Sequence, residues 1–281
     1  MYNINQGLIV FPTSASDVST AVLFSKSHNL ELSVRGGGHA TSGSSSTDGG
    51  LCIDLSKMRT VTVDPMAKII TAEGGALWSD VDTEAEKFGL ATVGGTVNHT
   101  GVGGLTLGGG YGYLTGKHGL VIDNLLEVEM VLADGSVVMA SETEKTDLFW
   151  AVRGAGASFG VATKVLYRAH EQKGLVWGGL LAFPKTQMEQ IVAFCNTVLD
   201  SEKNPDAKAI VFLSFGSPPP ALQPVVMAGV VYLGAEEEAK EFFAPLLNLE
   251  PLVDMTSGMS YSGLNAIFNG PMVPGVRRKY V

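Results

Sequence analysis

The sequence has few charged residues and only two cysteines. Charged side chains make up 17% of its 281 residues and hydrophobic ones 45%, a balance that indicates a globular chain with a large core. Its net charge of -9 gives it no attraction to nucleic-acid phosphates or to an anionic membrane surface. Cys52 and Cys195 lie in separate apolar segments, so we expect two buried free thiols and no disulfide.

Long hydrophobic runs are also absent. No stretch of roughly 18 apolar residues occurs, so we expect no membrane-spanning helix. Residues 1–7 lack the basic start and the apolar run of a secretion signal. The sequence by itself thus predicts a cytoplasmic chain, unless a secretion signal precedes Met1 in a longer protein.

The signatures of several enzyme classes are missing. A dinucleotide-binding fold needs Gly-x-Gly-x-x-Gly between a strand and a helix, and Gly101-Val102-Gly103-Gly104 does not have that spacing. No Gly-Lys-Ser/Thr follows a glycine cluster, and no Gly-x-Ser-x-Gly elbow joins an expected strand to a following helix. The five histidines show no paired spacing with one another or with cysteine, so no metal site is predicted.

Glycine is the abundant residue that needs an explanation. The 35 glycines gather at 36–50, 94–112 and 154–160. The first cluster follows an expected strand as Arg35-Gly36-Gly37-Gly38-His39. Successive glycines let backbone N–H groups approach an anion such as a pyrophosphate. Taken alone, however, this segment fits a tight turn with a surface histidine better.

The second cluster, residues 94–112, favours a ligand-binding role for the glycine segments over a simple turn. A loop this rich in glycine is costly in entropy, while Val102, Leu105 and Leu107 are too apolar for a flexible linker. A flat ring system with a diphosphate, pressed against the backbone, would account for it. The third cluster, within 153–161, lies between an expected helix and an expected strand and offers further backbone amides to a nucleotide.

Hydrophobic periodicity predicts an α+β chain in two parts. Residues 1–170 alternate short strands and helices around the glycine clusters, with 94–112 as a loop. After a break at 171–174, residues 175–281 are typical of an antiparallel sheet with helices on one face, and Pro218–Pro220 form a loop between two strands. The expected strands are 8–11, 32–34, 51–55, 61–63, 69–72, 125–132, 137–140, 160–169, 176–182, 210–215 and 225–233, and the expected helices are 14–27, 77–88, 146–152, 186–199 and 236–247.

Together these segments resemble the FAD-binding domain of the vanillyl-alcohol-oxidase type, in its berberine-bridge-enzyme and 6-hydroxy-D-nicotine-oxidase branch. Residues 35–39 are similar to the family's FAD-attachment motif, and 101–112 to its second flavin loop. The resemblance covers roughly residues 8–170. It implies a PCMH-type FAD-binding fold of two subdomains (residues 1–170), followed by part of a substrate-binding domain (residues 175–281). Four further segments follow in the family's order: Asp123-Asn124-Leu125, Ala133-Asp134-Gly135, residues 148–154 and residues 159–163.

The resemblance implies FAD held by a covalent 8α-histidyl bond to His39. Members with two covalent bonds place cysteine at the position of Val97 and often histidine at that of Leu105, so we expect a single bond here. Val102 falls where the family is thought to gate oxygen access. The implied cofactor-binding residues are Arg35, Gly36, Gly37, Gly38, His39, Gly43, Ser44, Thr96, Asn98, Thr100, Gly101, Val102, Gly103, Gly104, Gly108, Tyr111 and Val161.

The implied activity is an oxidase that transfers hydride from a small organic substrate to the flavin, which O2 then reoxidises. The chain is shorter than is usual in the family, which leaves a second interpretation, an FAD-binding relative with impaired catalysis. A third is a dehydrogenase that uses another electron acceptor. The sequence leaves the substrate, the oligomeric state and the catalytic base open. Candidates for the base, each more typical of a structural or solvent-facing role, are Tyr113, Lys117, His118, Tyr232 and Tyr261.

Overall fold

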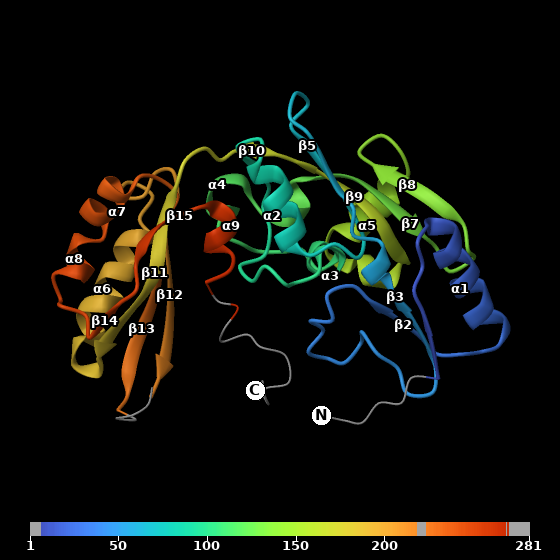
Figure 1. Cartoon of the computed structure of the whole chain (residues 1–281), viewed down its shortest axis with the longest axis horizontal. Helices are drawn as coiled ribbons and strands as arrows, with labels where there is room; N and C mark the ends of the chain where they lie inside the picture. Colours follow the sequence, from blue (N-terminus) through green and yellow to red (C-terminus); the bar gives the residue numbers. More distant parts are fainter. Residues whose placement is uncertain (1–6, 218–222, 268, 270–281) are drawn as a thin grey trace. The chain divides into compact units, whose positions relative to one another are not determined.

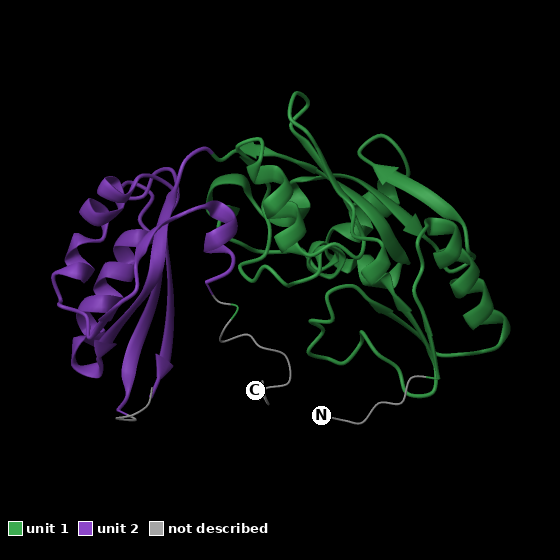
Figure 2. Cartoon of the chain, in the orientation of Figure 1, with its two compact units in different colours: residues 1–172, 268–281 green, residues 173–267 purple. Residues whose placement is uncertain are grey.

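The computed structural model describes residues 7–217, 223–267 and 269 of the 281-residue chain. The chain divides into two compact units, residues 1–172 together with those from 268 onward, and residues 173–267 (Figure 2). Each unit has its own sheets and its own hydrophobic core. The expected loop at Pro218–Pro220 lies outside the described residues.

A three-stranded parallel sheet with the order β1-β3-β2 forms the first part of the first unit. Helix α1 begins at its cap Ser14, whose side chain accepts a hydrogen bond from the backbone N–H of Asp17, as expected for an N-cap. The buried face of α1 packs on the central strand and also on Val131 and Val161 of the neighbouring sheet. The elements are β1 (Leu8–Val10), α1 (Ala15–Ser27), β2 (Leu32–Arg35), β3 (Leu51–Asp54) and the 3-10 turn η1 (Leu55–Lys57).

A five-stranded antiparallel sheet with the order β4-β5-β9-β7-β8 forms the second part (Figure 1). Its central strand β9 alternates buried and less buried residues along most of its length, as a sheet with one covered face requires. The strands are β4 (Val61–Asp64), β5 (Ile69–Glu73), β7 (Leu125–Val131), β8 (Val137–Ser141) and β9 (Val161–Arg168), and β6 (Leu90–Ala91) pairs with β10 (His170–Glu171). The helices are α2 (Trp78–Glu86), α3 (Val102–Leu107), α4 (Thr115–His118), η2 (Val121–Asp123), α5 (Thr146–Ala155) and η3 (Gly156–Ser158).

The second unit is an antiparallel sheet with the order β12-β13-β11-β14, and β15 also pairs with β11. Ile191 and Phe194 of α6 and Phe243 beside α7 pack into one core with the sheet, and Figure 1 shows α6, α7 and α8 on the same side of it. The elements are β11 (Val176–Pro184), η4 (Lys185–Gln187), α6 (Met188–Val198), β12 (Ala209–Gly216), β13 (Val225–Tyr232), α7 (Glu236–Phe242), α8 (Ala244–Leu247), β14 (Val253–Asp254), β15 (Ser257–Met259) and α9 (Tyr261–Leu264).

These elements confirm the predicted α+β class and the antiparallel sheet with helices on one face. Three expectations were wrong in detail. Residues 94–112 are not a loop throughout, because α3 lies inside them. The expected helix 236–247 is interrupted at Phe243, which separates α7 from α8. Both cysteines are free, but only Cys52 is buried, whereas Cys195 is half-buried. None of the helices in the described part of the chain is long and apolar enough to cross a bilayer.

Candidate functional site

The first glycine segment begins where β2 ends. Arg35 is the last residue of β2 and lies opposite Asp54 of β3 in the parallel register. Its Nη1 is 3.5 Å from Oδ2 of Asp54, whose carboxylate is buried. Gly38 has a φ of +70°, and a Cβ there would stand 3.3 Å from Nε of Arg35. The guanidinium therefore secures the start of the turn, and the glycine supplies the left-handed backbone that the turn requires.

The first two glycine segments meet backbone to backbone. A Cβ on Gly37 would lie 2.2 Å from the backbone N of Gly101, and a Cβ on Gly101 would lie 2.2 Å from the N of Gly37. No side chain fits between chains this close. The approach brings together two segments that lie more than 60 positions apart, and it explains why each carries glycine at this point.

The same approach brings two histidines together. Nε2 of His39 lies 2.7 Å from Nδ1 of His99, and the ring centroids are 4.7 Å apart. His39 is exposed, whereas Nε2 of His99 is buried and has no hydrogen-bond partner in the described structure. A buried polar nitrogen without a partner is rare and points to a ligand or a water. His99 was missed by the sequence interpretation, which named its neighbours Asn98 and Thr100.

Helix α3 follows directly after this contact. Val102 is fully buried, and its N–H donates to the backbone oxygen of Ala76. A Cβ on Gly103 would approach the oxygen of Gly74 to 3.2 Å, whereas a Cβ on Gly104 would meet nothing within 4 Å. The backbone is thus packed against protein at Gly103 and open at Gly104.

The third glycine segment borders a cavity of about 360 Å³ in the first unit. Its wall includes Val161, the first residue of β9, and Val34 of β2, one residue before the first glycine segment. Gly156-Ala157-Ser158-Phe159-Gly160 has the Gly-x-Ser-x-Gly spacing of hydrolases, but it follows a helix and precedes a strand, the reverse of a nucleophile elbow. The cavity is lined mainly by apolar groups, among them Val22, Leu32, Val34, Val131, Phe159 and Val161.

The remaining expected site residues lie around these features. The backbone oxygens of Asn98 and Thr100 accept from the first turn of α2, and Oδ1 of Asn98 accepts from Asn269. Thr96 is half-buried, and its oxygen accepts from the hydroxyl of Tyr113 at 3.5 Å. Burial raises the pKa of Tyr113, which keeps that hydroxyl protonated at neutral pH. Gly43 and Ser44 lie in the exposed loop before β3.

Gly108 and Tyr111 lie beyond the end of α3. The N–H of Gly108 donates to the oxygens of Leu105 and Thr106, and Tyr111 is exposed. The structure therefore joins the segment of Gly37 and His39 to that of Gly101. The cavity beside Val161 begins next to the first of these segments. Among the residues with described positions, no group of three or more His, Cys, Asp or Glu side chains is placed to hold a metal ion.

Comparison with known proteins places this geometry among flavoproteins. Residues 7–141 match the family model described as FAD binding domain. The FAD-linked oxidoreductase pgmH of Aspergillus terreus is 42% identical over 257 residues, which cover 90% of this chain and 51% of that protein. The chain spans about half the length of the curated relatives it matches.

Two solved structures are similar over nearly the whole chain. The 6-hydroxy-D-nicotine oxidase from Arthrobacter nicotinovorans has a TM-score of 0.85 at 32% identity, with 98% of this chain and 62% of that one covered. A glucooligosaccharide oxidase from Acremonium strictum, described with a 6-S-cysteinyl, 8α-N1-histidyl FAD, has a TM-score of 0.79 at 26% identity, with 99% and 58% covered. These similarities confirm the predicted two-subdomain FAD-binding fold.

Proposed function

Because the chain belongs to the FAD-linked oxidoreductases of the berberine-bridge-enzyme-like family, we propose that its first unit holds FAD through one covalent bond to His39. We further propose that the protein of which the chain is part oxidises a small organic molecule and passes the electrons to O2. The observation that carries the first statement is the contact of His39 with His99 where two glycine segments meet.

The residues around this contact suit a flat, polar cofactor. The buried Nε2 of His99 lacks a partner, and a flavin ring offers both donors and acceptors to such an atom. The backbone is open at Gly104 and Gly43, where an added Cβ would meet nothing within 4 Å. Glycines of this kind let a ligand lie directly against the chain.

Different segments of the first unit would bind different parts of FAD. Residues 36–39 with Gly43 and Ser44 would hold the pyrophosphate, and 96–104 would lie along the flavin. The apolar cavity beside Val161, about 360 Å³ in volume, has room for the adenosine half. Once bound, the flavin supplies the hydride and O2 chemistry, and the protein supplies position and electrostatics. Val97 has no thiol, which supports a single covalent bond.

His99 has a defined task in forming that bond. A histidine is nucleophilic through the ring nitrogen that bears no proton. If Nε2 of His39 carries the proton and donates it to Nδ1 of His99, Nδ1 of His39 is the bonding atom. Bonding of Nδ1 to the flavin's 8α-methyl carbon would break a C–H bond there and leave two electrons on the flavin, which O2 would take up. The imidazole of His39 would stay neutral only if Nε2 also gave up its proton, and Nδ1 of His99, 2.7 Å away, would accept it. We therefore assign His39 as the anchor and His99 as the base that accepts its proton.

Acid precipitation tests the assignment. Protein incubated with FAD is precipitated, and the yellow colour is measured in the pellet and in the supernatant. We expect the colour in the wild-type pellet, in the supernatant for His39→Ala, and in the pellet for the control His28→Ala, which removes an exposed histidine at the end of α1. His99→Ala should still bind FAD but form the bond about 10²-fold more slowly, the usual contribution of a general base.

Each outcome separates the alternatives. Covalent colour in His39→Ala contradicts the anchor, and an unchanged rate in His99→Ala contradicts the role of His99. A wild-type pellet that is coloured but is not bleached anaerobically by any candidate substrate supports a flavin-binding chain without turnover. Reoxidation by a dye and not by O2 would indicate a dehydrogenase.

A further inference from the structure

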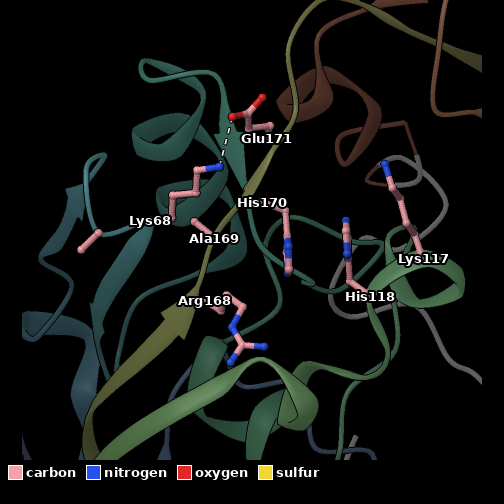
Figure 3. A pocket seen from close by; sticks show the side chains of 8 residues that line it. Lys68, Lys117, His118, Arg168, Ala169, His170 and Glu171 are labelled. Atoms are coloured by element: carbon pink, nitrogen blue, oxygen red, sulfur yellow. Dashed lines mark hydrogen bonds and ion pairs between the residues drawn. The ribbon is translucent and has the colours of Figure 1, made fainter.

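A second cleft lies in the first unit, on segments that the flavin proposal does not use. It has a volume of about 520 Å³ and is lined by the turn before β5, by α4 and by the end of β9 with β10. Figure 3 shows these side chains on three separate segments, with the rings of His118 and His170 side by side and Lys68 directed at Glu171. The lining residues are Ala67, Lys68, Lys117, His118, Arg168, Ala169, His170 and Glu171.

The side chains that line this cleft are mainly basic, whereas the chain as a whole is acidic. The chain has a net charge of -9, yet the cleft gathers two lysines, an arginine and two histidines around a single carboxylate. Glu171 pairs with Lys68 at 3.1 Å. Lys117 and Arg168 belong to none of the ion pairs found among the described residues, and both are exposed. Like charges held together repel one another, and a bound anion removes that repulsion.

The two histidines form a fixed wall. The rings of His118 and His170 are stacked, with centroids 3.6 Å apart and an interplanar angle of 6°. Nε2 of His170 lies 2.7 Å from Oδ1 of Asn124, which is 1% exposed. The amide nitrogen of Asn124 donates to the oxygens of His118 and Leu120, both at 2.9 Å. Asn124 therefore presents its oxygen to His170, and Nε2 of His170 carries a proton.

We propose that this cleft binds a small molecule with a doubly charged oxyanion group, a phosphate or a dicarboxylate. Lys117 and Arg168 supply the fixed positive charge, and the stacked histidines supply a rigid wall whose charge rises with proton uptake. The volume exceeds that of a single phosphate, which leaves room for an organic remainder. The site shares no residue with the His39–His99 contact and does not depend on the proposed oxidase activity.

Proton uptake links this binding to pH. His170 is faced by His118, Arg168, Lys117 and Lys68, with Glu171 next to it and Asn124 bonded to it. All these ionisable groups except Glu171 disfavour a positive imidazole, and a dianion in the cleft reverses that effect. Burial and these charges lower the pKa of His170 to about 4 in the free chain, and a bound anion raises it. We therefore expect proton uptake to favour binding as the pH falls from about 7 toward about 5.

Calorimetric titration of inorganic phosphate, with chloride holding the ionic strength constant, tests the proposal. Wild type should bind, and Lys117→Gln and Arg168→Gln should each weaken binding by at least about fivefold, the size of one exposed charge interaction. Lys57→Gln, an exposed lysine at the end of η1, should bind as wild type does. A parallel titration with citrate shows whether the group preferred is a phosphate or a carboxylate.

Circular dichroism of each variant separates loss of binding from loss of fold. Between about pH 7 and about pH 5, where phosphate itself loses charge, affinity should fall less in wild type than in His170→Gln, which completes the expected result. Absence of binding by both phosphate and citrate overturns the proposal. So does equal affinity of wild type, Lys117→Gln and Arg168→Gln.

Discussion

The meeting of the two glycine segments yields the sharpest prediction. Replacing Gly37 with alanine puts a Cβ 2.2 Å from the backbone N of Gly101 and 2.7 Å from its Cα. Both neighbours are backbone atoms and cannot rotate away, so the segments must separate. Overpacking of this kind costs about 1–3 kcal/mol. At about 2–4 °C per kcal/mol for a domain of this size, the melting temperature should fall by roughly 2–12 °C.

Gly36 provides a matched control. It neighbours Gly37, is half-buried like it, and neither residue has a positive φ. A Cβ on Gly36 would stand 3.5 Å from the oxygen of Gly74, an ordinary contact. Gly36→Ala should therefore leave stability unchanged or raise it by up to about 1 kcal/mol through the lower entropy of the unfolded chain.

The assay is thermal unfolding followed by circular dichroism, with and without added FAD. Gly37→Ala should melt well below Gly36→Ala in both conditions. It should also lose covalent flavin, because separating the segments moves His39 away from His99. Coinciding melting curves for the two variants would refute the argument that the backbones are in contact here.

Three further predictions follow. Gly104→Ala should raise the melting temperature of the FAD-free chain, since helix propensity favours alanine by about 1 kcal/mol and the Cβ meets nothing, but it should weaken FAD retention. Burial, and after it the charges of His118 and Arg168, lower the pKa of His170 in the folded chain to about 4. As the pH falls, His170 therefore takes up a proton in the unfolded chain before it does so in the folded chain. The free energy of unfolding should fall as the pH drops from about 6.5 toward 4, and it should fall less in His170→Asn than in wild type. Phe243→Ala should cost about 3–5 kcal/mol in urea unfolding, because the buried ring packs on Trp177.

The elements were predictable because their signals are local. Alternation in residues 160–169 and the helical spacing in 14–27 are set by neighbours within a few positions, and the structure has β9 and α1 there. Helix α3 was missed because Gly103 and Gly104 lower helix propensity. Burial of Val102 and Leu107 compensates for that cost, and burial is a tertiary effect that the pattern does not show.

The candidate site was only half predictable, for a related reason. His39 follows from a contiguous motif. The partnership with His99 depends on the contact of Gly37 with Gly101, which no spacing along the chain reveals. The basic cleft depends in the same way on strand register, since β5 pairs with β9 so that Ile69 lies opposite Arg168. That register puts Lys68 beside a segment a hundred residues later.

The five histidines had no paired spacing, yet the fold makes two pairs of opposite character. His39 and His99 point ring nitrogens at one another, 2.7 Å apart, so a proton can pass along the line between them. His118 and His170 lie face to face at 6°, and Nε2 of His170 contacts Oδ1 of Asn124. A stacked pair has no hydrogen bond through which one ring can deprotonate the other. The first pair therefore has the geometry that the proposed covalent bond requires, and the second pair fits the proposed binding of an anion.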